Sequence, residues 1–265
     1  FHPLKHCIVG RGADPASVAE PLKQIMRTTA EDLNNLVNTL EEMGVVCYRP
    51  NIETKQDRPP ISPRDYFVAL GGKLFVGKDI LKLVNREAIK WYLNNDISSG
   101  NIVRCGNHVH WDISKDVHID TEKEILNWFS DNKYKVSITR HGWHMDGVYS
   151  ILKPGLIVAS HDLPELETIY PRWDIFYPTK QIEPKPIQHE WGGKHTESHY
   201  DVNILSVDEE NCILAYENKE LFRFLEKNKI NPILCRFRDK QFWDNGIHCV
   251  TQDLYREGNM EDYFG

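Results

Sequence analysis

The sequence lacks several features, each of which would have indicated a different class of protein. It has no run of about 18 apolar residues, so no segment is long enough to span a membrane. The net charge of -7 argues against a general nucleic-acid-binding protein, which would carry a basic face. The absence of a GxGxxG fingerprint disfavours a dinucleotide-binding sheet. With no low-complexity tract or linker either, we predict one domain over residues 1–265.

The cysteines form no CxxC pair, and most of them lie inside apolar, strand-like runs. A chain this long needs no disulfides to stabilise its core, so we expect free thiols in a reducing cytoplasm. Residues 1–5 also lack the charged-then-apolar layout of a signal peptide. The six cysteines are Cys7, Cys47, Cys105, Cys212, Cys235 and Cys249.

Short β-like runs alternate with amphipathic helices along the chain. Capping-box spacing at Thr28 and Glu31 predicts one helix, which ends at Gly44, and Thr121 with Glu124 predicts another. Further helices are predicted over 85–95 and 218–228. Strands are predicted over 45–48, 66–70, 73–76, 101–104, 108–113, 134–138, 147–152, 155–159, 173–177, 202–207, 211–216 and 232–237.

The order of these elements gives roughly five units, most of them strand–strand–helix–strand, at a spacing of about fifty residues. Repeats of this length are typical of propeller-like closure. The units share negligible sequence identity, so the prediction of an α/β propeller is based on element order alone. An open α/β sheet is the alternative.

Cys249 differs from most of the other cysteines in its surroundings. It lies beside His248 and close to Gly246, after the polar loop 244–246. A reactive thiol needs a polar setting that favours the thiolate, so Cys249 is the candidate nucleophile. A buried structural thiol is the alternative.

His144 and Asp146 lie two residues apart, which places them on one face of a strand. His144 is a candidate general acid and base, and Asp146 is a candidate cation ligand. Taken alone, the pair is more often a surface feature, and Asp65 in Pro63-Arg64-Asp65 is more often a turn residue.

His108, His110 and Asp112 alternate along a predicted strand and would face one way. Such a set can bind a metal ion, although the spacing shows no fourth ligand. A metal-dependent enzyme built on these residues is an alternative.

Several stretches together resemble the glycine amidinotransferase family of the pentein, or guanidino-group-modifying, superfamily. The likeness covers nearly the whole chain, and its motifs follow one another in the family's order. The resemblance implies a five-bladed α/β propeller with the active site at its centre, in agreement with the five units. The stretches are residues 3–11, Pro63-Arg64-Asp65, His144-Met145-Asp146, Pro154-Gly155 and residues 246–258.

The resemblance also implies roles for the candidate residues. Cys249 would attack the guanidinium carbon and hold a covalent amidino group, while His144 would shuttle protons. Asp65 and Asp146 would bind the guanidinium, because paired carboxylate hydrogen bonds orient and neutralise this planar cation.

Arg64 and Asn101 complete the predicted substrate-binding set. The sequence gives no sign of a cofactor. The predicted partners are a small guanidino donor and an amine acceptor, with no nucleic acid and no membrane. A homodimer is an open alternative for the assembly.

Some positions depart from the family pattern. Ser98 takes the place of a carboxylate that normally supports the histidine, and Asp96 or Asp112 is an alternative for that role. Leu163 occupies the slot of an arginine that helps to bind the substrate's carboxylate, and Gly192-Gly193 replaces a pair of serines with the same use. These changes leave the donor open between arginine and another guanidino compound.

The predicted activity is transfer of an amidino group from a guanidino donor to an amine. Hydrolysis, as in deiminase-like relatives, is the alternative in the same class, and access of water to the pocket decides between them. A guanidino-binding protein with impaired catalysis is a further alternative, which Ser98 keeps open.

Overall fold

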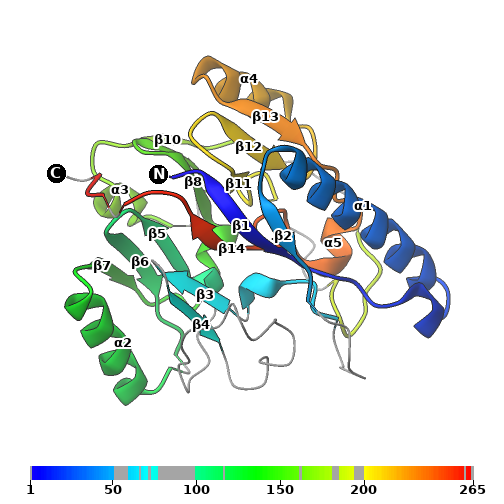
Figure 1. The fold of residues 1–265 in the computed structure, drawn as a ribbon, viewed down its shortest axis with the longest axis horizontal. Coiled ribbons are helices and arrows are strands. Elements are labelled where there is room, and N and C mark those ends of the chain that lie inside the picture. Colours follow the sequence, from blue (N-terminus) through cyan, green and yellow to red (C-terminus); the bar gives the residue numbers. More distant parts are fainter. Residues whose placement is uncertain are drawn as a thin grey trace.

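The computed structural model describes residues 2–50, 59–65, 67–70, 73–76, 99–115, 117–160, 163–180, 185–193, 200–259 and 261–263. Its strands form five small sheets that follow one another around the molecule (Figure 1). The first sheet joins the two ends of the chain, because β1 (Leu4–Val9) lies between β14 (Thr251–Arg256) and β2 (Val46–Tyr48).

The other sheets follow in chain order. They are β3 (Phe67–Leu70) with β4 (Lys73–Val76); β5 (Ile102–Cys105), β6 (His108–Asp112) and β7 (Lys135–Thr139); β8 (Tyr149–Lys153), β9 (Leu156–Ala159) and β10 (Asp174–Phe176); and β11 (Leu205–Ser206), β12 (Asn211–Leu214) and β13 (Asn231–Leu234).

Four of the sheets repeat one pattern. Two strands pair antiparallel, a helix follows, and a third strand then pairs parallel with the second. The helix supplies the crossover connection that a parallel pair needs. The crossover helices are α1 (Leu22–Glu42), α2 (Ile119–Asp131), α3 (Leu166–Ile169) and α4 (Lys219–Lys227).

The five units, or blades, close into a ring. The strand β14 contacts β3, and β8 contacts β11. The last and first blades are joined by the backbone N–H of Leu4, which donates to the carbonyl of Val207 at 2.8 Å. The five-bladed α/β propeller is therefore confirmed, and the open-sheet alternative is wrong.

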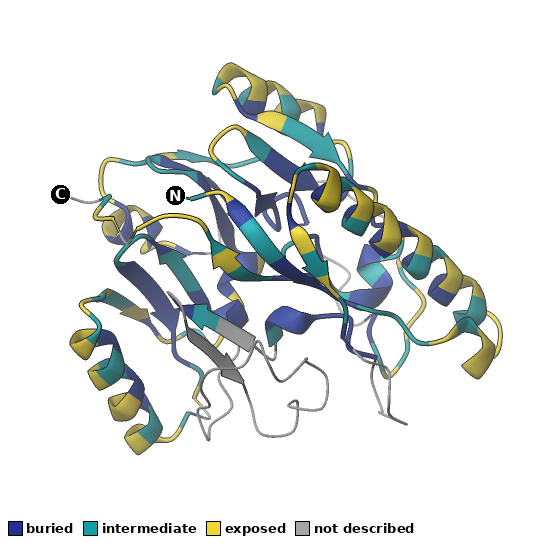
Figure 2. Ribbon diagram, in the orientation of Figure 1, coloured by how far each residue is buried: buried dark blue, intermediate teal, exposed yellow. Residues whose placement is uncertain are grey.

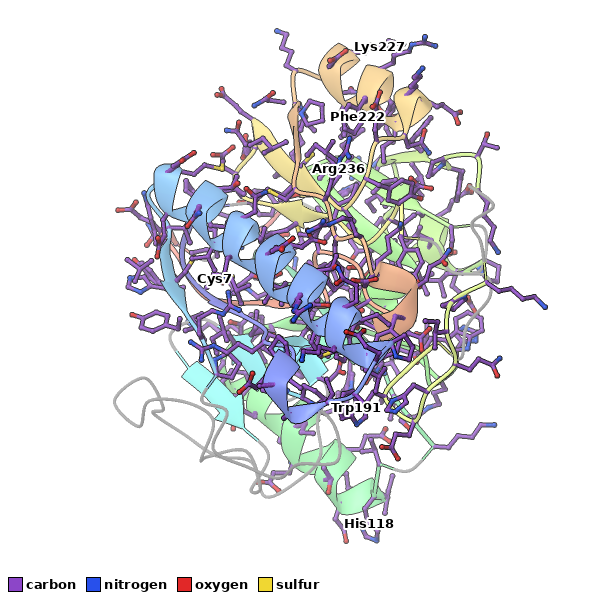
Figure 3. All side chains as sticks on the ribbon, turned by 90° about the vertical axis from the view of Figure 1, so that its right-hand side faces the viewer. Cys7, His118, Trp191, Phe222, Lys227 and Arg236 are labelled. Carbon is purple, nitrogen blue, oxygen red and sulfur yellow. The ribbon has the colours of Figure 1, made fainter. Side chains whose placement is uncertain are left out.

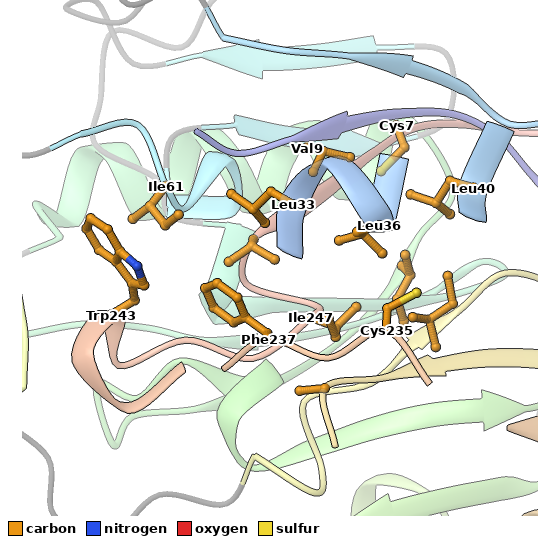
Figure 4. Close-up of a cluster of buried hydrophobic side chains, with 14 of the residues drawn as sticks. Cys7, Val9, Leu33, Leu36, Leu40, Ile61, Cys235, Phe237, Trp243 and Ile247 are labelled. Carbon is orange, nitrogen blue, oxygen red and sulfur yellow. The ribbon is translucent and has the colours of Figure 1, made fainter. Parts of the chain in front are cut away.

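The helix α1 covers the first blade because one of its faces is apolar. Leu33, Leu36 and Leu40 repeat at helical spacing and are buried in a cluster with Cys7 and Val9 of β1 (Figure 4). The exposed residues of the helices face outward, while buried residues gather on the strands (Figure 2). The same cluster also includes Ile61, Cys235, Phe237, Trp243 and Ile247.

Two helices start earlier than their capping-box spacing predicted. Thr28 lies inside α1, where its hydroxyl donates to the carbonyl of Gln24 at 3.0 Å. Thr121 lies inside α2, whose first turn is capped by the His118 ring accepting from the N–H of Asp120. A Thr and a Glu three residues apart also occur inside helices. Taking this spacing as a capping box therefore placed the two predicted helix starts too late.

The helix α4 starts where the sequence predicted. The Asn218 side chain accepts from the N–H of Glu220 at 3.0 Å and of Leu221 at 3.3 Å, which satisfies two first-turn donors. In Figure 3, Lys227 at the end of α4 and His118 before α2 lie at opposite ends of the molecule. The helix predicted over 85–95 lies outside the described residues.

All six cysteines are free thiols, as predicted. Within the described ranges, no helix is long and apolar enough to cross a membrane.

The burial of α1 predicts the effect of truncating its apolar face. We expect Leu36→Ala to lower the free energy of unfolding by about 2–5 kcal/mol, because it leaves a cavity in the core. Urea unfolding followed by circular dichroism measures the change. Asn38→Ala, on the exposed face of the same helix, is the matched control and should change stability little. Equal losses in both variants would contradict the packing described above.

Candidate active site

Each blade has a short turn just before its first strand, and the chain order places these turns at equivalent positions. The turn before β3 contacts the turn before β5, which in turn contacts the turn before β8. The turns are η2 (Pro63–Asp65) before β3, η5 (Ser99–Asn101) before β5, η6 (Met145–Gly147) before β8, residues 200–203 before β11 and residues 247–250 before β14.

Cys249 lies in the last of these turns and is only 8% exposed. Its Sγ lies 3.2 Å from Asp146 Oδ2 and 3.0 Å from Asn203 Nδ2. Its backbone N–H donates to Asn203 Oδ1 at 3.1 Å. The structure therefore brings the predicted nucleophile within hydrogen-bond distance of the predicted cation-binding carboxylate.

Asn203 is a site residue that the sequence did not single out. Besides its two bonds to Cys249, its Nδ2 donates to the backbone carbonyl of Asp146 at 2.9 Å. Gly246 permits this approach, since a Cβ there would lie 2.4 Å from Asn203 Oδ1. The one signal in the sequence was a polar side chain between Val202 and the apolar pair Ile204 and Leu205.

Asp146 is almost fully buried, at 2% exposure, and its two oxygens differ. Oδ2 accepts from His248 Nδ1 at 3.0 Å, whereas Oδ1 has no hydrogen-bond partner among the described residues. Burial alone would raise the pKa of Asp146, but the hydrogen bond from His248 and the neighbouring positive charges outweigh burial and hold the pKa below its usual range. The site thus contains an ionised oxygen that lacks a donor, which is costly unless a cationic group supplies one.

His248 is the second residue that sequence reasoning missed, because the sequence marks it only as the neighbour of Cys249. A carboxylate only accepts hydrogen bonds, so Nδ1 of His248 carries the hydrogen in its bond to Asp146. Burial and the nearby Arg64 charge lower the pKa of His248, which favours the neutral imidazole.

His144 and Asp65 meet at the rim of the site. His144 Nδ1 lies 3.6 Å from Asp65 Oδ1, and the two side chains are 48% and 24% exposed. The ring packs against Gly100, where a Cβ would lie 2.8 Å from Nδ1. The site thus has a half-exposed imidazole beside a carboxylate at its rim.

Asn101 and Asp112 hold the segment 141–144, which leads into the η6 turn. Asp112 accepts from the backbone N–H groups of His141 at 2.9 Å and Trp143 at 2.8 Å. Asn101 donates to the carbonyl of Trp143 at 2.8 Å. Contact of Asn101 with substrate, and support of the histidine ring by Asp112, both stay predictions.

The other two candidates for supporting the histidine, Ser98 and Asp96, lie outside the described residues. The described neighbour Ser99 donates to Gln252 Oε1 at 2.8 Å, which ties the η5 turn to β14.

Arg64 contacts the turn that holds Cys249. Its Nε lies 2.9 Å from the carbonyl of His248 and 3.0 Å from that of Thr251, and its Nη2 lies 2.8 Å from Asp253 Oδ1. These bonds fix the backbone on both sides of Cys249. The predicted contact between Arg64 and substrate stays a prediction.

His108, His110 and Asp112 do not form the alternative metal site. His110 Nδ1 lies 2.8 Å from the Tyr149 hydroxyl, and its Nε2 lies 2.9 Å from Thr139 Oγ1. That threonine donates to Asp112 at 2.6 Å, and burial lowers the pKa of His110 to about 4. In the part of the chain that the structure describes, no three such side chains could hold a metal ion. The metal alternative is therefore wrong, because a hydrogen-bond network already engages these groups.

Leu163 and Gly192-Gly193, which depart from the family pattern, have packing roles. Leu163 is buried in the apolar cluster beneath α3. A Cβ on Gly192 would lie 1.9 Å from the carbonyl of Phe242 in α5 (Lys240–Trp243). None of these positions offers a cation or a hydroxyl to a substrate carboxylate.

The electrostatics of the site favour a cation. Burial, together with the charges of Asp146 and Asp65, raises the pKa of the Cys249 thiol well above its ordinary value. Without a ligand the thiol is therefore protonated, in agreement with its contact to Asp146. A cation bound between the carboxylates would offset their charges and favour the thiolate.

A cavity of about 440 Å³ adjoins this site but is separate from its chemistry. His248 and Arg64 line it, together with residues of β5, β8 and β14. Cys249, Asp146 and His144 are not among its lining residues. His248 is thus in contact with Asp146 and also borders this second space.

Comparisons with known proteins agree with the fold. No family model matches the chain. L-arginine:L-lysine amidinotransferase of Pseudomonas savastanoi pv. phaseolicola is 26% identical over 147 residues, which is 52% of this chain and 39% of that protein. Mitochondrial glycine amidinotransferase of Xenopus laevis is 24% identical over 128 residues, or 46% of this chain and 28% of that protein. The matches thus span less than half the length of these curated relatives.

Solved structures match over the whole ring. SxtG, an amidinotransferase of the saxitoxin biosynthetic pathway from Microseira wollei, has a TM-score of 0.78 at 19% identity over 100% of this chain and 98% of its own. Inosamine-phosphate amidinotransferase StrB1 of Streptomyces griseus has a TM-score of 0.76 at 19% identity, covering 99% and 97%. Dimethylarginine dimethylaminohydrolase of Pseudomonas aeruginosa has a TM-score of 0.66 at 12% identity, covering 94% and 98%. The predicted resemblance is confirmed: the chain has the five-bladed pentein fold, and in sequence it is similar to the amidinotransferases.

Proposed function

We propose that the protein is an amidinotransferase, which moves an amidino group from a guanidino donor to an amine through a covalent intermediate on Cys249. The observation that supports this best is the Asp146 carboxylate. One oxygen contacts the Cys249 thiol, and the other is buried without a donor among the described residues. A planar cation with several N–H groups, bound to the open oxygen, would have its central carbon next to the sulfur.

Asp65 would bind the other edge of the guanidinium. Its carboxylate faces the site near His144, and its charge acts on Cys249 together with that of Asp146. Two carboxylates on a monocation orient it and neutralise it, and the buried setting strengthens both contacts.

The first half of the reaction replaces a C–N bond with a C–S bond. The Cys249 thiol passes its proton to His144, and the thiolate attacks the guanidinium carbon. The C–N bond to the donor then breaks, and His144 supplies a proton to the departing amine. The sulfur is left with a cationic amidino group, which Asp146 and Asp65 hold in place of the donor.

The second half reverses these steps with a different amine. His144 takes a proton from the acceptor amine, whose lone pair attacks the amidino carbon. The C–S bond breaks, which releases the new guanidino compound, and His144 returns the proton to the sulfur, which restores the thiol. No external oxidant or cofactor is needed to balance either step.

Transfer is favoured over hydrolysis because the sulfur is largely shielded from solvent. Cys249 is 8% exposed, and a site that excludes water allows an amine to take the group instead. The curated relatives that the chain resembles are amidinotransferases, although their matches cover only part of each. The relative named for arginine suggests an arginine-like donor. Because Leu163 and Gly192-Gly193 lack the groups that bind a substrate carboxylate in the family pattern, another guanidino compound stays an alternative donor.

The remaining parts of the proposal concern setting and partners. The predicted partners are small molecules, namely a guanidino donor and an amine acceptor. Six free thiols favour a reducing compartment such as the cytoplasm. A homodimer stays a prediction.

The covalent step predicts an adduct on one cysteine. After brief exposure to arginine or other guanidino compounds and an acid quench, intact mass should rise by one amidino group. Cys249→Ala should show no adduct and no turnover while keeping its fold. Cys47→Ala is the matched control and should behave like the unmodified protein. An adduct that persists in Cys249→Ala would place the nucleophile elsewhere.

Asp146→Asn should have opposite effects on turnover and on thiol alkylation. It removes the charge that binds the guanidinium, so kcat/KM should fall by about 10²-fold or more. It also removes a charge that raises the pKa of Cys249, so iodoacetamide should alkylate this thiol faster at pH 8. Asp174→Asn, at an exposed position in β10, is the control. Slower alkylation in Asp146→Asn would contradict the electrostatic account.

The two neighbouring histidines should differ in effect. His144→Ala should lower kcat by about 10²–10⁴-fold, because it removes the proton carrier. His141→Ala should cost far less, since the contact of this residue with Asp112 is made by its backbone N–H. Steady-state kinetics on both variants tests the assignment, and the reverse ranking would show that the wrong histidine was chosen.

A further inference from the structure

The chemistry proposed above leaves His248 without a role, although it is the residue next to the reacting thiol. Its side chain is only 20% exposed, and its Nδ1 donates to Asp146 Oδ2 at 3.0 Å. The proton carrier of the reaction is His144, on a different blade. His248 therefore reaches the reacting groups through Asp146.

The two donors on Asp146 are on the same oxygen. His248 Nδ1 and the Cys249 thiol both contact Oδ2, at 3.0 Å and 3.2 Å. Oδ1 has no partner among the described residues. When the thiol gives up its proton, its hydrogen bond to Oδ2 disappears, and the bond from His248 stays. Of these two donors, His248 is thus the one that can hold the carboxylate through the reaction.

Hydrogen bonds from other blades fix the backbone at His248 and at the residue after it. Arg64 Nε donates to the carbonyl of His248 at 2.9 Å, and its Nη2 is anchored on Asp253 at 2.8 Å. The next residue is fixed by the bond from the Cys249 N–H to Asn203 at 3.1 Å. Because the backbone of His248 is fixed, its ring stays in place. The hydrogen bond from this ring therefore opposes rotation of the Asp146 carboxylate.

We propose that His248 is a positioning residue, which keeps the Asp146 carboxylate ionised and turned so that one oxygen stays open for the guanidinium. This inference rests on the proposed function, because it assigns Asp146 the guanidinium as its ligand. It explains why a buried histidine stands next to a nucleophile that uses a different histidine for proton transfer.

The other charges around Asp146 do not replace His248. His144 lies in the same turn as Asp146, Asp65 and Arg64 come from η2, and Cys249 precedes β14. Arg64 is already bound to Asp253 and to backbone carbonyls, and the charge of Asp65 opposes ionisation of a second carboxyl. Without His248, burial would dominate and Asp146 would take up a proton at a higher pH.

The test compares variants that keep or remove the donor. His248→Ala removes it, whereas His248→Asn retains an N–H at the position of Nδ1. His108→Asn is the matched control, because it replaces a buried histidine that contacts Ser137 and not Asp146. Should the alanine variant not fold, His248→Gln takes its place, since its donor lies one carbon farther from the backbone.

Two readouts are taken for each variant across pH. The first is the ¹³C NMR titration of the Asp146 carboxyl without substrate, assigned by its loss in Asp146→Asn. The second is the rate of adduct formation on Cys249 with arginine and a panel of guanidino donors. In His248→Ala we expect the carboxyl titration and the acid limb of the rate profile to move up by about 1–2 pH units. His248→Asn should stay closer to the unmodified protein, and His108→Asn should not shift.

The outcomes separate this inference from the proposed function. A loss of rate that is uniform with pH, with an unchanged carboxyl titration, would overturn the positioning role. The other outcome is a shifted Asp146 titration in His248→Ala while no donor forms an adduct on Cys249 in any variant. It would support the effect of His248 on Asp146 and contradict the proposed amidinotransferase activity.

Discussion

A single buried carboxylate organises the centre of this propeller. Asp146 is 2% exposed, it contacts the thiol and the His248 ring through one oxygen, and it leaves the other without a donor among the described residues. Such an arrangement is unfavourable on its own, because a desolvated charge needs compensation. It becomes favourable when a cation with its own N–H groups enters. Under the proposed function the site is therefore complete only with its guanidino ligand, and the raised pKa of the Cys249 thiol arises from the same charges.

The fold provides what this carboxylate needs. Repetition of the blade places a turn before the first strand of each unit, so that residues from five distant segments arrive at one place. Pairing of β14 with β1 closes the ring and carries Cys249 to the carboxylate. Arg64 and Asn203 then fix the backbone around the sulfur through five hydrogen bonds to the segment 248–253. In sequence the chain is similar to amidinotransferases, and a solved amidinotransferase structure shares its fold.

Local and repeated features were predictable from the sequence. Alternation and helical spacing predicted most of the strands, the blades and α4, but not β14, and the polar surroundings of Cys249 distinguished it from the core thiols. The helix starts at Thr28 and Thr121 were misplaced because the spacing of a capping box also fits a helix interior. The residues that were missed act over long range: His248 meets Asp146 across 102 positions, and Asn203 meets Cys249 across 46. Arg64, predicted to bind substrate, reaches the His248 carbonyl across 184 positions. Such contacts form only when the blades close into a ring, so local sequence patterns cannot predict them.

The central claim is that a guanidinium cation binds at the open oxygen of Asp146 with its carbon facing the sulfur. The most direct measurement is a crystal structure of the Cys249→Ser variant soaked with guanidinium chloride and, separately, with arginine. The account predicts an N–H of the guanidinium within hydrogen-bond distance of Asp146 Oδ1, and the guanidinium carbon next to the introduced serine hydroxyl, which stands in for the thiol. A guanidinium found only in the neighbouring 440 Å³ cavity, with Asp146 Oδ1 still unpaired, would contradict the account.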